Sequence, residues 1–522
     1  MPKVGKQPCA SVGRNRVLPH TPSISDAAPD REKVSVRRKP VFFSPPFMAA
    51  NADATAAILS AITVPRSSPR ARFVNWGLSF ECLPLAIFEP RTEAECGLVL
   101  EMARREGKVL KAVGVGHSPS DLACTGDFML RMTRLDKLLE VDGEKRLVTV
   151  QAGITLTALH AVLAKHNLAM RNVGSISDQT LGGIVTTASH GSGIGYASMS
   201  DDVESLTLLL ANGETVSCSR SERSDLFWAT LCSLGATGII LRVQLRVENA
   251  FRLKDELSSR PFEDVVNNLD TLVRSAEHVR FWWIAATHMV KCSFVNRTAE
   301  PKRPPVPWFY RVFLAFHIVQ IMLFLGRYFP SINTLTGRFV TWLGLAPVTL
   351  VDDSPSIFNV ECRYPQHTTE WAVPLEQAPA CLKELKDWMD REAQDPNGLR
   401  PHFPFEIRFS RGDDIWLSPA YGRETCWIGI AQYRPYGLNV PYRTLFARYE
   451  AIVSKYSGRP HWAKAHPLTP RDLATMYPKF TDFQRVLEEY DPERRFANEY
   501  VRRHVWGEEE SAVGARVWKA RG

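Results

Sequence analysis

Hydrophobic and polar positions between Trp76 and Phe251 predict strands and helices that follow one another along the chain. Short apolar runs predict strands at 109–113, 128–132, 147–152 and 238–247. A helical pattern covers 156–165, and Asn212-Gly213 between two apolar runs predicts a hairpin turn. This mixture of elements predicts one α+β domain over residues 76–251.

A helix start is marked inside this domain by a Thr-x-x-Glu capping box. Thr92 and Glu95 supply the two side chains, and the helix is expected to run to about residue 105. Ala94, Leu98 and Met102 are spaced four apart, so we expect them on one face of this helix.

Residues 252–455 have a different composition, richer in Trp, Phe and Pro, and contain strand-like runs at 279–285 and 427–433. They predict a second α+β domain. Its most apolar stretch, 306–325, contains Arg311, His317 and Gln320. These polar residues make a membrane-spanning helix costly. Two alternatives remain open: a helix lying in a membrane interface, with Trp308 among its aromatic residues, and a buried helix of the second domain.

The basic charge of the chain lies in its N-terminal part. Of 64 Lys and Arg and 56 Asp and Glu overall, residues 1–75 contain 12 and 4, so the remaining residues carry equal numbers of each sign. A nucleic-acid-binding body needs a basic face on its folded part and is therefore not expected. Residues 1–75 are proline-rich without an apolar period, which predicts a disordered basic extension. A mitochondrial presequence and a plain solvated extension both stay open.

Metal and disulfide chemistry are not expected. The ten cysteines form no CxxC pair and no zinc-like spacing, so we interpret them as reduced thiols of an intracellular protein.

Two glycine-rich loops, each beside a histidine, carry the candidate chemistry. Gly114 and Gly116 follow the strand at 109–113, and glycine there lets backbone N–H groups approach a phosphate or a flat ring. A second cluster at 175–193 is dense in glycine and hydroxyl residues. Pro119 excludes a dinucleotide-binding GxGxxG helix start after the first loop, yet the pair of loops favours a phosphate-bearing cofactor.

Longer strings around these loops make the pattern specific. They are AVGVGHSPSDLACTGDFML from residue 112, RNVGSISDQTLGGIVTTASHGSG from residue 171, FEIRFSRGDDIWLSPAYGR from residue 405, HWAK at 461–464 and DPERRFANEYVRR from residue 491. Together they resemble the aldonolactone oxidoreductases of the vanillyl-alcohol-oxidase flavoprotein class. The resemblance covers about residues 76–505, and the fungal D-arabinono-1,4-lactone oxidases look most similar.

The resemblance implies an α+β fold in which a two-subdomain FAD-binding domain of the vanillyl-alcohol-oxidase (PCMH) type, at 76–251, carries an α+β substrate cap at 252–455. The segment 456–522, which carries HWAK, would return to the FAD domain. His117 stands where the family bonds histidine covalently to the flavin 8α-methyl carbon. The residues assigned to FAD in this way are Gly114, Val115, Gly116, His117, Ser118, Ser175, Gly182, Gly183, Ser189, His190, Gly191 and, on the adenine side, Ile239.

By the same resemblance, Glu406 and Arg408 bind the polyol-like substrate, and their alternation on a strand points both to one face. Lys464 matches an active-site lysine that would polarise the reacting oxygen or accept its proton. The implied reaction oxidises D-arabinono-1,4-lactone, or a related aldono-1,4-lactone, with O2 to D-erythroascorbate and H2O2. A dehydrogenase that reduces cytochrome c or a quinone is the alternative. A membrane-associated scaffold without turnover is a third hypothesis, which the presence of all these residues disfavours.

The choice of electron acceptor is expected to depend on Gly174. In the plant dehydrogenase of this family the matching residue is alanine, whose methyl group would block O2 from the reduced flavin, whereas glycine leaves the approach open. The alternative is that Gly174 only permits a backbone turn. The resemblance to fungal enzymes also implies a mitochondrial, membrane-associated location for this protein. Another intracellular membrane and the cytosol are the alternatives.

Overall fold

The computed structural model describes residues 46–359, 364–402, 404–508 and 517–519. The chain divides into two units, Met1–Ala52 and Asp53–Gly522, and the description below concerns the second. Most of the extension predicted at 1–75 lies outside the described residues. Its end differs from the prediction: α1 (Pro46–Ile62), η1 (Pro69–Ala71) and β1 (Phe73–Val74) have regular structure, because their apolar side chains, among them Phe73, find a core to enter.

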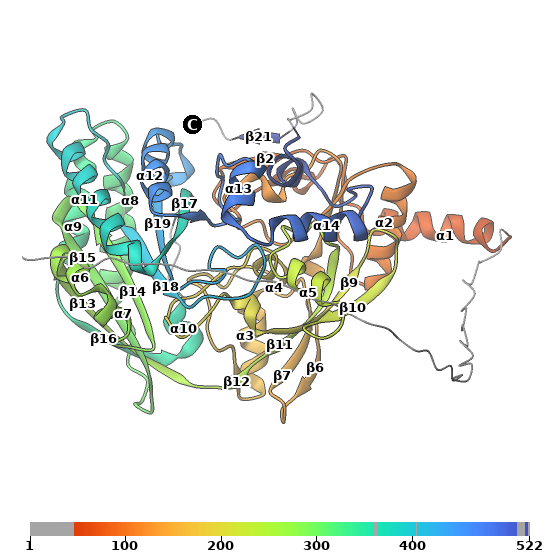
Figure 1. Ribbon diagram of the computed structural model, residues 1–522, viewed down its shortest axis with the longest axis horizontal. Coiled ribbons are helices and arrows are strands. Elements are labelled where there is room, and N and C mark those ends of the chain that lie inside the picture. Colours follow the sequence, from red (N-terminus) through yellow and green to blue (C-terminus); the bar gives the residue numbers. More distant parts are fainter. Residues whose placement is uncertain (1–45, 360–363, 403, 509–516, 520–522) are drawn as a thin grey trace, which may run out of the picture. The chain divides into compact units, whose positions relative to one another are not determined.

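Two sheets form the region that follows. A parallel sheet has the order β3 (Ala86–Phe88), β5 (Phe128–Arg131), β4 (Leu110–Val113). An antiparallel sheet has the order β10 (Thr215–Ser219), β9 (Val203–Leu209), β11 (Ile239–Arg246), β7 (Leu147–Gln151), β6 (Leu138–Asp142). The predicted strands are thus confirmed to within one residue, and so is the hairpin, whose Gly213 has a φ of +88°. The helices are α2 (Glu93–Arg105), α3 (Leu156–Lys165), α4 (Leu181–Val185) and α5 (Ser224–Thr230) (Figure 1).

The capping box of α2 is confirmed, because both reciprocal hydrogen bonds between Thr92 and Glu95 are present. The face that carries Ala94, Leu98 and Met102 is not the most buried one. The buried residues are Cys96, Val99, Leu100 and Ala103, whereas Ala94 is exposed. The helix carries apolar residues on more than one side. The buried residues are spaced by three and four, which makes a wider apolar face than a row in which every spacing is four.

An eight-stranded sheet dominates residues 252–460 (Figure 1). Its order is β16 (Val348–Asp353), β13 (Arg252–Pro261), β15 (Met289–Thr298), β14 (His278–Ile284), β18 (Phe405–Ser410), β19 (Thr425–Tyr433), β17 (Gln366–Pro374), β20 (Arg459–Pro460). The strands predicted at 279–285 and 427–433 are confirmed here as β14 and β19.

Successive side chains of a strand point to opposite faces, so this sheet has one apolar and one polar face. The apolar side chains include Phe281, Phe405, Ile428 and Trp371, all buried in one core with helices α6 (Phe262–Asn267), α7 (Leu269–Val273), α11 (Ala378–Gln394) and α12 (Arg443–Lys455). Burying each such large side chain stabilises the domain by about 1.5–3 kcal/mol. The residues between them therefore point to the other face, and that face carries the polar site described below.

The C-terminal segment packs against the N-terminal sheets. Helices α13 (Pro470–Met476) and α14 (Phe480–Tyr490) place Phe483 and Leu487 in the same hydrophobic core as Val148 and Leu206. Helix α15 (Glu499–Val501) follows, and β21 (Val517–Lys519) pairs with β2 (Phe80–Cys82). Strands β8 (Leu168–Ala169) and β12 (Glu248–Asn249) form a further small pair. The described residues contain eight cysteines, all of them free and buried thiols.

The apolar stretch at 306–325 forms the π-helical segment η6 (Phe309–Ile318) and helix α8 (Val319–Gly326). The buried-helix alternative is wrong for most of it: Trp308 is 61% exposed, and only 17% of the 18-residue window from Phe309 is buried. By length and composition, this is the one helix among the described residues that could cross a membrane. The next helices along the chain are α9 (Ser331–Leu343) and α10 (Ser354–Phe358). Helix α9 also exposes apolar side chains, Leu335 and Trp342.

Candidate active site

The first glycine-rich loop leaves β4 and lies against the second. A Cβ on Gly114 would lie 1.9 Å from Thr180 Oγ1, so only glycine allows this approach. Gly116 has a φ of +80°, and its carbonyl accepts a hydrogen bond from the Trp76 N–H at 2.9 Å. Both predicted loops are therefore brought together, with their backbones close to one another.

A cavity opens between these loops. Eight of the residues predicted for the cofactor line it: Gly114, Val115, Gly116, His117, Ser118, Gly182, Gly183 and Ser189. Both glycine-rich loops therefore contribute to one wall, as a cofactor held between them would require.

The remaining predicted cofactor residues lie elsewhere. Ser175 and Gly191 line a second, small cavity, and His190 is buried behind it. Ile239 differs from the prediction, because its side chain packs in a hydrophobic core while its neighbours Gly238 and Ile240 line the large cavity. On a strand, adjacent side chains point to opposite faces, so an error of one residue reverses the assignment.

His117 presents a neutral ring to the large cavity. Its imidazole stacks on Trp76 with 5.3 Å between ring centroids and an angle of 19°. Burial lowers the pKa of His117 to about 4, with Asp178 raising it and Lys464 lowering it further. A ring nitrogen without a proton is therefore available at neutral pH, which is the form that can make a covalent bond.

Lys111 is a lining residue that the sequence analysis missed. Its ammonium donates to the Leu234 carbonyl at 2.6 Å, and burial lowers its pKa to about 7. The signal was a single lysine inside the apolar run just before the first glycine-rich loop. At this pKa the amine is only partly protonated at neutral pH, and the negative phosphates of a nucleotide cofactor would favour its charged form.

The polar face of the eight-stranded sheet gathers charged side chains from neighbouring strands. Glu406 and Arg408 share this face of β18, as predicted from their alternation. Glu406 forms a cross-strand row with Gly429 of β19 and Glu370 of β17. Because Gly429 has no side chain, the two carboxylates flank an open position in the sheet.

Glu370 is the carboxylate at the centre of this face. Its side chain is 5% exposed, and its Oε1 accepts a hydrogen bond from Arg408 Nη2 at 2.6 Å. Its Oε2 lies 3.7 Å from the ammonium of Lys464. Burial raises the pKa of Glu370, but Arg408 and the other neighbours outweigh it and hold this pKa well below its usual range.

Sequence analysis missed Glu370. The available signal was an acidic residue in the strand-like run Thr368-Thr369-Glu370-Trp371-Ala372, with apolar residues directly after it. Pattern alone gives such a residue no partner, because its partners come from distant segments of the chain.

Lys464 lies where the large cavity meets the polar face of the eight-stranded sheet. It lines the large cavity, and its backbone N–H donates to the His461 carbonyl at 2.8 Å. The His461 N–H in turn donates to the Glu370 carbonyl at 3.0 Å. The HWAK segment is thus fixed to β17, and its lysine is placed where the cavity meets the charged face.

The other contacts of Arg408 leave part of its guanidinium open. Nη1 lies 3.4 Å from the His190 carbonyl, and Nε lies 3.9 Å from Glu406 Oε1 without a hydrogen bond. Ser175 donates to the same Glu406 oxygen at 3.3 Å. A buried Nε–H donor without a partner next to an acceptor carboxylate suits a hydroxylated ligand.

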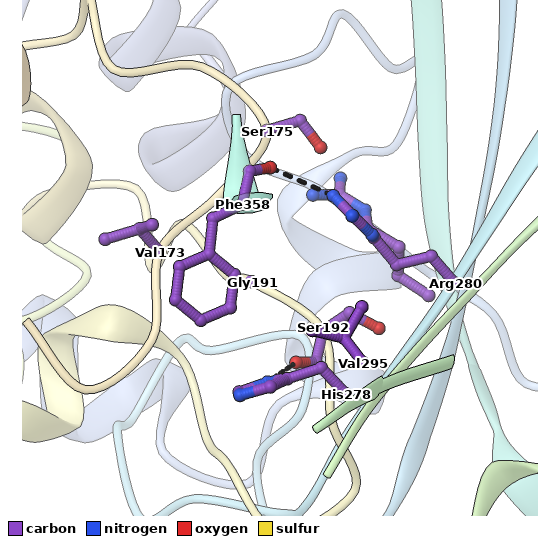
Figure 2. A pocket seen from close by; sticks show the side chains of 9 residues that line it. Val173, Ser175, Gly191, Ser192, His278, Arg280, Val295 and Phe358 are labelled. Carbon is purple, nitrogen blue, oxygen red and sulfur yellow. Dashed lines mark hydrogen bonds between the residues drawn. The ribbon is translucent and has the colours of Figure 1, made fainter. Parts of the chain in front are cut away.

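Figure 2 shows the small cavity beside Arg408, with Arg280 and Phe358 on its walls. Arg280 stands directly opposite Arg408 on the neighbouring strand and donates to the Phe358 carbonyl at 2.9 Å. His278 Nδ1 donates to the Ser192 carbonyl at 2.7 Å. Burial lowers the pKa of Arg280, while Asp255 at 3.6 Å opposes that shift. No motif in the sequence indicated this second arginine.

Gly174 lies where the second loop passes His190. A Cβ on Gly174 would lie 3.3 Å from the His190 carbonyl oxygen, the atom that Arg408 Nη1 approaches. A methyl group at this position would be tight but would need a shift of only a few tenths of an ångström.

Three side chains here have the spacing of metal ligands. One ligand atom from each of His190, Glu370 and His461 lies within 4.8 Å of the others. Arg408 and Lys464 already approach the two carboxylate oxygens, so a metal ion would have to displace both cations. The geometry is that of an anion shared by two cationic side chains.

Comparisons with known proteins agree on one group. Residues 243–504 match the family model "D-arabinono-1,4-lactone oxidase", and residues 84–219 match "FAD binding domain". The chain is 38% identical over 431 residues to the L-gulonolactone oxidase of Scyliorhinus torazame, covering 82% of this chain and 97% of that one. It is 31% identical over 478 residues to the putative D-arabinono-1,4-lactone oxidase of Neurospora crassa, covering 83% and 85%.

Among solved structures, a solvent-stable cholesterol oxidase superposes with a TM-score of 0.71 at 21% identity, covering 84% of this chain and 99% of that one. At this identity the likeness shows a shared fold.

Proposed function

The chain belongs to the D-arabinono-1,4-lactone oxidase family, and from this we propose that it oxidises D-arabinono-1,4-lactone with O2 to D-erythroascorbate and H2O2, and related aldono-1,4-lactones to the corresponding ascorbate-type products. The predicted fold, a two-subdomain FAD-binding region of the vanillyl-alcohol-oxidase (PCMH) type with an α+β cap, is confirmed. One observation supports the chemistry above all: Lys464 lines the large cavity while its ammonium lies 3.7 Å from the carboxylate that holds Arg408.

The residues around the large cavity fit FAD. Its two loops offer backbone N–H groups and hydroxyls without side chains in the way, and Lys111 adds a buried positive charge for the diphosphate. Gly114 to Ser118 and Gly182 to Ser189 would hold the cofactor. When bound, FAD supplies the two-electron acceptor that lactone oxidation needs and the reduced form that O2 reoxidises with release of H2O2.

The charged face would bind and orient the lactone. Oxidation removes a hydride from C2 and a proton from its hydroxyl, and the resulting 2-keto lactone tautomerises to the enediol product. We propose that Arg408 donates to substrate oxygens through its open Nε edge and that Glu406 accepts from substrate hydroxyls. Lys464 would stabilise the reacting oxygen or take its proton. Holding the hydroxyl in one orientation is itself a large part of such catalysis.

Purified protein tests the function directly. We expect five- and six-carbon aldono-1,4-lactones to be consumed in step with H2O2 formation, with D-arabinono-1,4-lactone among the good substrates. Reduction of cytochrome c without H2O2 would establish the dehydrogenase alternative instead. Protein without flavin absorbance would leave only a scaffold.

We propose that the FAD is bonded covalently to His117. The neutral ring of His117 at the cavity wall supports this, because its nitrogen lone pair would bond to the 8α-methyl carbon as that carbon gives up one hydrogen as a proton. The two electrons would be taken up by the flavin, which O2 would reoxidise with release of H2O2. Acid precipitation should leave the yellow colour in the pellet of wild-type protein and in the supernatant of His117→Ala. His166→Ala, on an exposed histidine at the end of α3, is a matched control that should keep the colour in the pellet. Wild-type colour wholly in the supernatant would contradict the bond.

We also propose that the segment formed by η6, α8 and α9 attaches the enzyme peripherally to a membrane, mitochondrial if it follows its fungal relatives. Trp308, Phe309 and Trp342 are each more than half exposed, and such aromatic residues favour a lipid interface. Arg311 within η6 favours a helix in the membrane plane over a crossing.

Cell fractionation and flotation with lipid vesicles measure this attachment. The pair Phe309→Glu and Trp342→Glu should move the protein to the soluble fraction, whereas Leu139→Glu, an exposed leucine on β6, should not. Wild-type protein recovered wholly as soluble at low salt without detergent would refute the attachment.

A further inference from the structure

We propose that Glu370 is a positioning residue for lactone oxidation, whose carboxylate charge holds Arg408 and Lys464 in place on the polar face of the sheet. The inference rests on the proposed function and adds a residue to it. It draws on the burial of Glu370, on its two cationic contacts and on the neutrality of the histidines around it.

Glu370 is placed by the sheet rather than by a loop. Its strand β17 pairs with β19 over nine residues from Gln366 to Pro374, and Trp371 on the opposite face is buried in the core. The carboxylate is therefore fixed in direction. A charge this deeply buried is costly unless it is paired and hydrogen-bonded, so its two cations are needed for it to remain ionised.

The two cations depend on Glu370 in turn. Among the described residues, Glu370 is the only acidic side chain whose oxygen lies within 4.0 Å of the Lys464 ammonium. Arg408 has one further carboxylate nearby, Glu406, but only at 3.9 Å from its Nε. Because Glu370 takes Nη2, the guanidinium turns its Nε edge toward Glu406 and the expected substrate. Glu370 thus acts through the residues that would touch the lactone.

The histidines beside this carboxylate contribute shape rather than charge. His190 stacks on Trp427 with 3.6 Å between centroids. Its Nδ1 lies 2.9 Å from the Gly191 carbonyl, and its Nε2 lies 3.4 Å from Glu370 Oε1 without a hydrogen bond. Burial, reinforced by Arg408, lowers the pKa of His190, and burial likewise holds the pKa of His461 well below its usual range. With both rings neutral, Glu370 supplies the negative charge between the two cations.

These facts predict how the pH dependence of substrate oxidation changes without this charge. The titratable or charged groups around Glu370 are Arg408 and Glu406 on β18, His190 in the second glycine-rich loop, His461 and Lys464 in the HWAK segment, and Tyr449 on α12. Among these, Lys464 is the group whose protonation the reaction is proposed to use. Removing the carboxylate charge leaves two cations without their anion, so the electrostatic potential around the reacting oxygen becomes more positive. A more positive potential favours loss of protons within the site, so the pH profile of flavin reduction moves to lower pH.

Two variants separate charge from position. Glu370→Gln keeps the size of the side chain and removes its charge, whereas Glu370→Asp keeps the charge and withdraws it by one methylene group. Glu450→Gln is the matched control: Glu450 is a largely buried carboxyl on α12 that accepts from Thr369, the neighbour of Glu370, on the opposite face of the sheet.

The measurement is the rate of flavin reduction by D-arabinono-1,4-lactone without oxygen between pH 5 and 9, with flavin content and melting temperature recorded for each protein. We expect Glu370→Gln to be slower by about a hundredfold, with its profile displaced to lower pH by about one unit. Glu370→Asp should be about tenfold slower with the wild-type profile, because its charge remains. Glu450→Gln should match the wild type.

Glu370→Gln with normal flavin content, a rate within threefold of wild type and an unchanged profile would overturn the proposal. If this variant does not retain flavin, Glu370→Asp decides: a slower rate with the wild-type profile supports the proposal, and wild-type kinetics overturn it. Failure of the proposed function would look different, because the wild-type flavin itself would not be reduced by any lactone.

Discussion

Alanine in place of Arg408 is expected to lower kcat/KM for the aldonolactone by about a hundredfold or more, a loss of roughly 3 kcal/mol of transition-state stabilisation. The guanidinium is held by Glu370 and by the His190 carbonyl, and its open Nε edge is the donor proposed for the substrate. Alanine removes this donor and leaves the buried carboxylate of Glu370 without its main partner. Alanine at Glu406 or Lys464 should have an effect of similar size.

Folding defects must be separated from lost binding in this experiment. Arg408→Lys keeps a positive charge near Glu370 but lacks the planar fork, so it should fold and still lose most of the activity. Arg411→Ala is the matched control, because Arg411 lies just past the same strand but is half-exposed and pairs with Asp201 on the surface. Flavin reduction within threefold of wild type in the alanine variants at Arg408, Glu406 and Lys464 would show that the substrate site lies elsewhere.

The second large effect is expected from Gly174→Ala, which should reoxidise slowly in O2 while still reducing an artificial dye. A single methyl group can close a passage that a diatomic molecule barely fits, since protein interiors leave few voids of that size. The new Cβ would lie 3.3 Å from the His190 carbonyl oxygen, which requires only a small adjustment. Lactone-dependent flavin reduction should therefore stay near the wild-type rate.

Stopped-flow reoxidation of the dithionite-reduced protein measures the rate at which O2 oxidises the reduced flavin, with no substrate present. Gly195→Ala is the control, because a Cβ on Gly195 would meet no atom within 4 Å. Reoxidation of Gly174→Ala at the wild-type rate, with its flavin intact, would exclude the gate. Slower reduction by lactone with normal reoxidation would instead indicate that the methyl group disturbs Arg408 through His190.

Local signals in the sequence were enough to predict six of the strands, the hairpin at Asn212-Gly213, the capping box of α2 and the two glycine-rich loops. Capping, turn chemistry and period depend on a few neighbouring residues, so a short window contains them. The side of an element that is buried was less predictable. On α2 the buried positions are not the row Ala94, Leu98 and Met102, and the Ile239 side chain packs in a core, because tertiary packing selects among apolar residues that the pattern leaves equivalent.

Site residues that stand in a recognisable sequence motif were also predictable. A site residue that is important only because of its contacts with distant segments was not. Glu406, Arg408 and Lys464 stand in strings long enough to resemble a family. Glu370 stands alone in its strand and becomes significant only when β17 lies two strands from β18 and the HWAK segment binds to it. Strand order in an antiparallel sheet depends on long-range pairing, which no window of the sequence contains.

The shared core of the first and last segments has a consequence for synthesis of the protein on the ribosome. Phe483 and Leu487 pack with Val148 and Leu206, and His461 and Lys464 complete the wall of the large cavity. The cavity therefore cannot close until nearly the whole chain has emerged, although its glycine-rich loops are made early. Until then the nascent N-terminal sheets expose apolar surface, which makes chaperone binding during translation an advantage and truncation near residue 460 more damaging than the loss of a small C-terminal piece suggests.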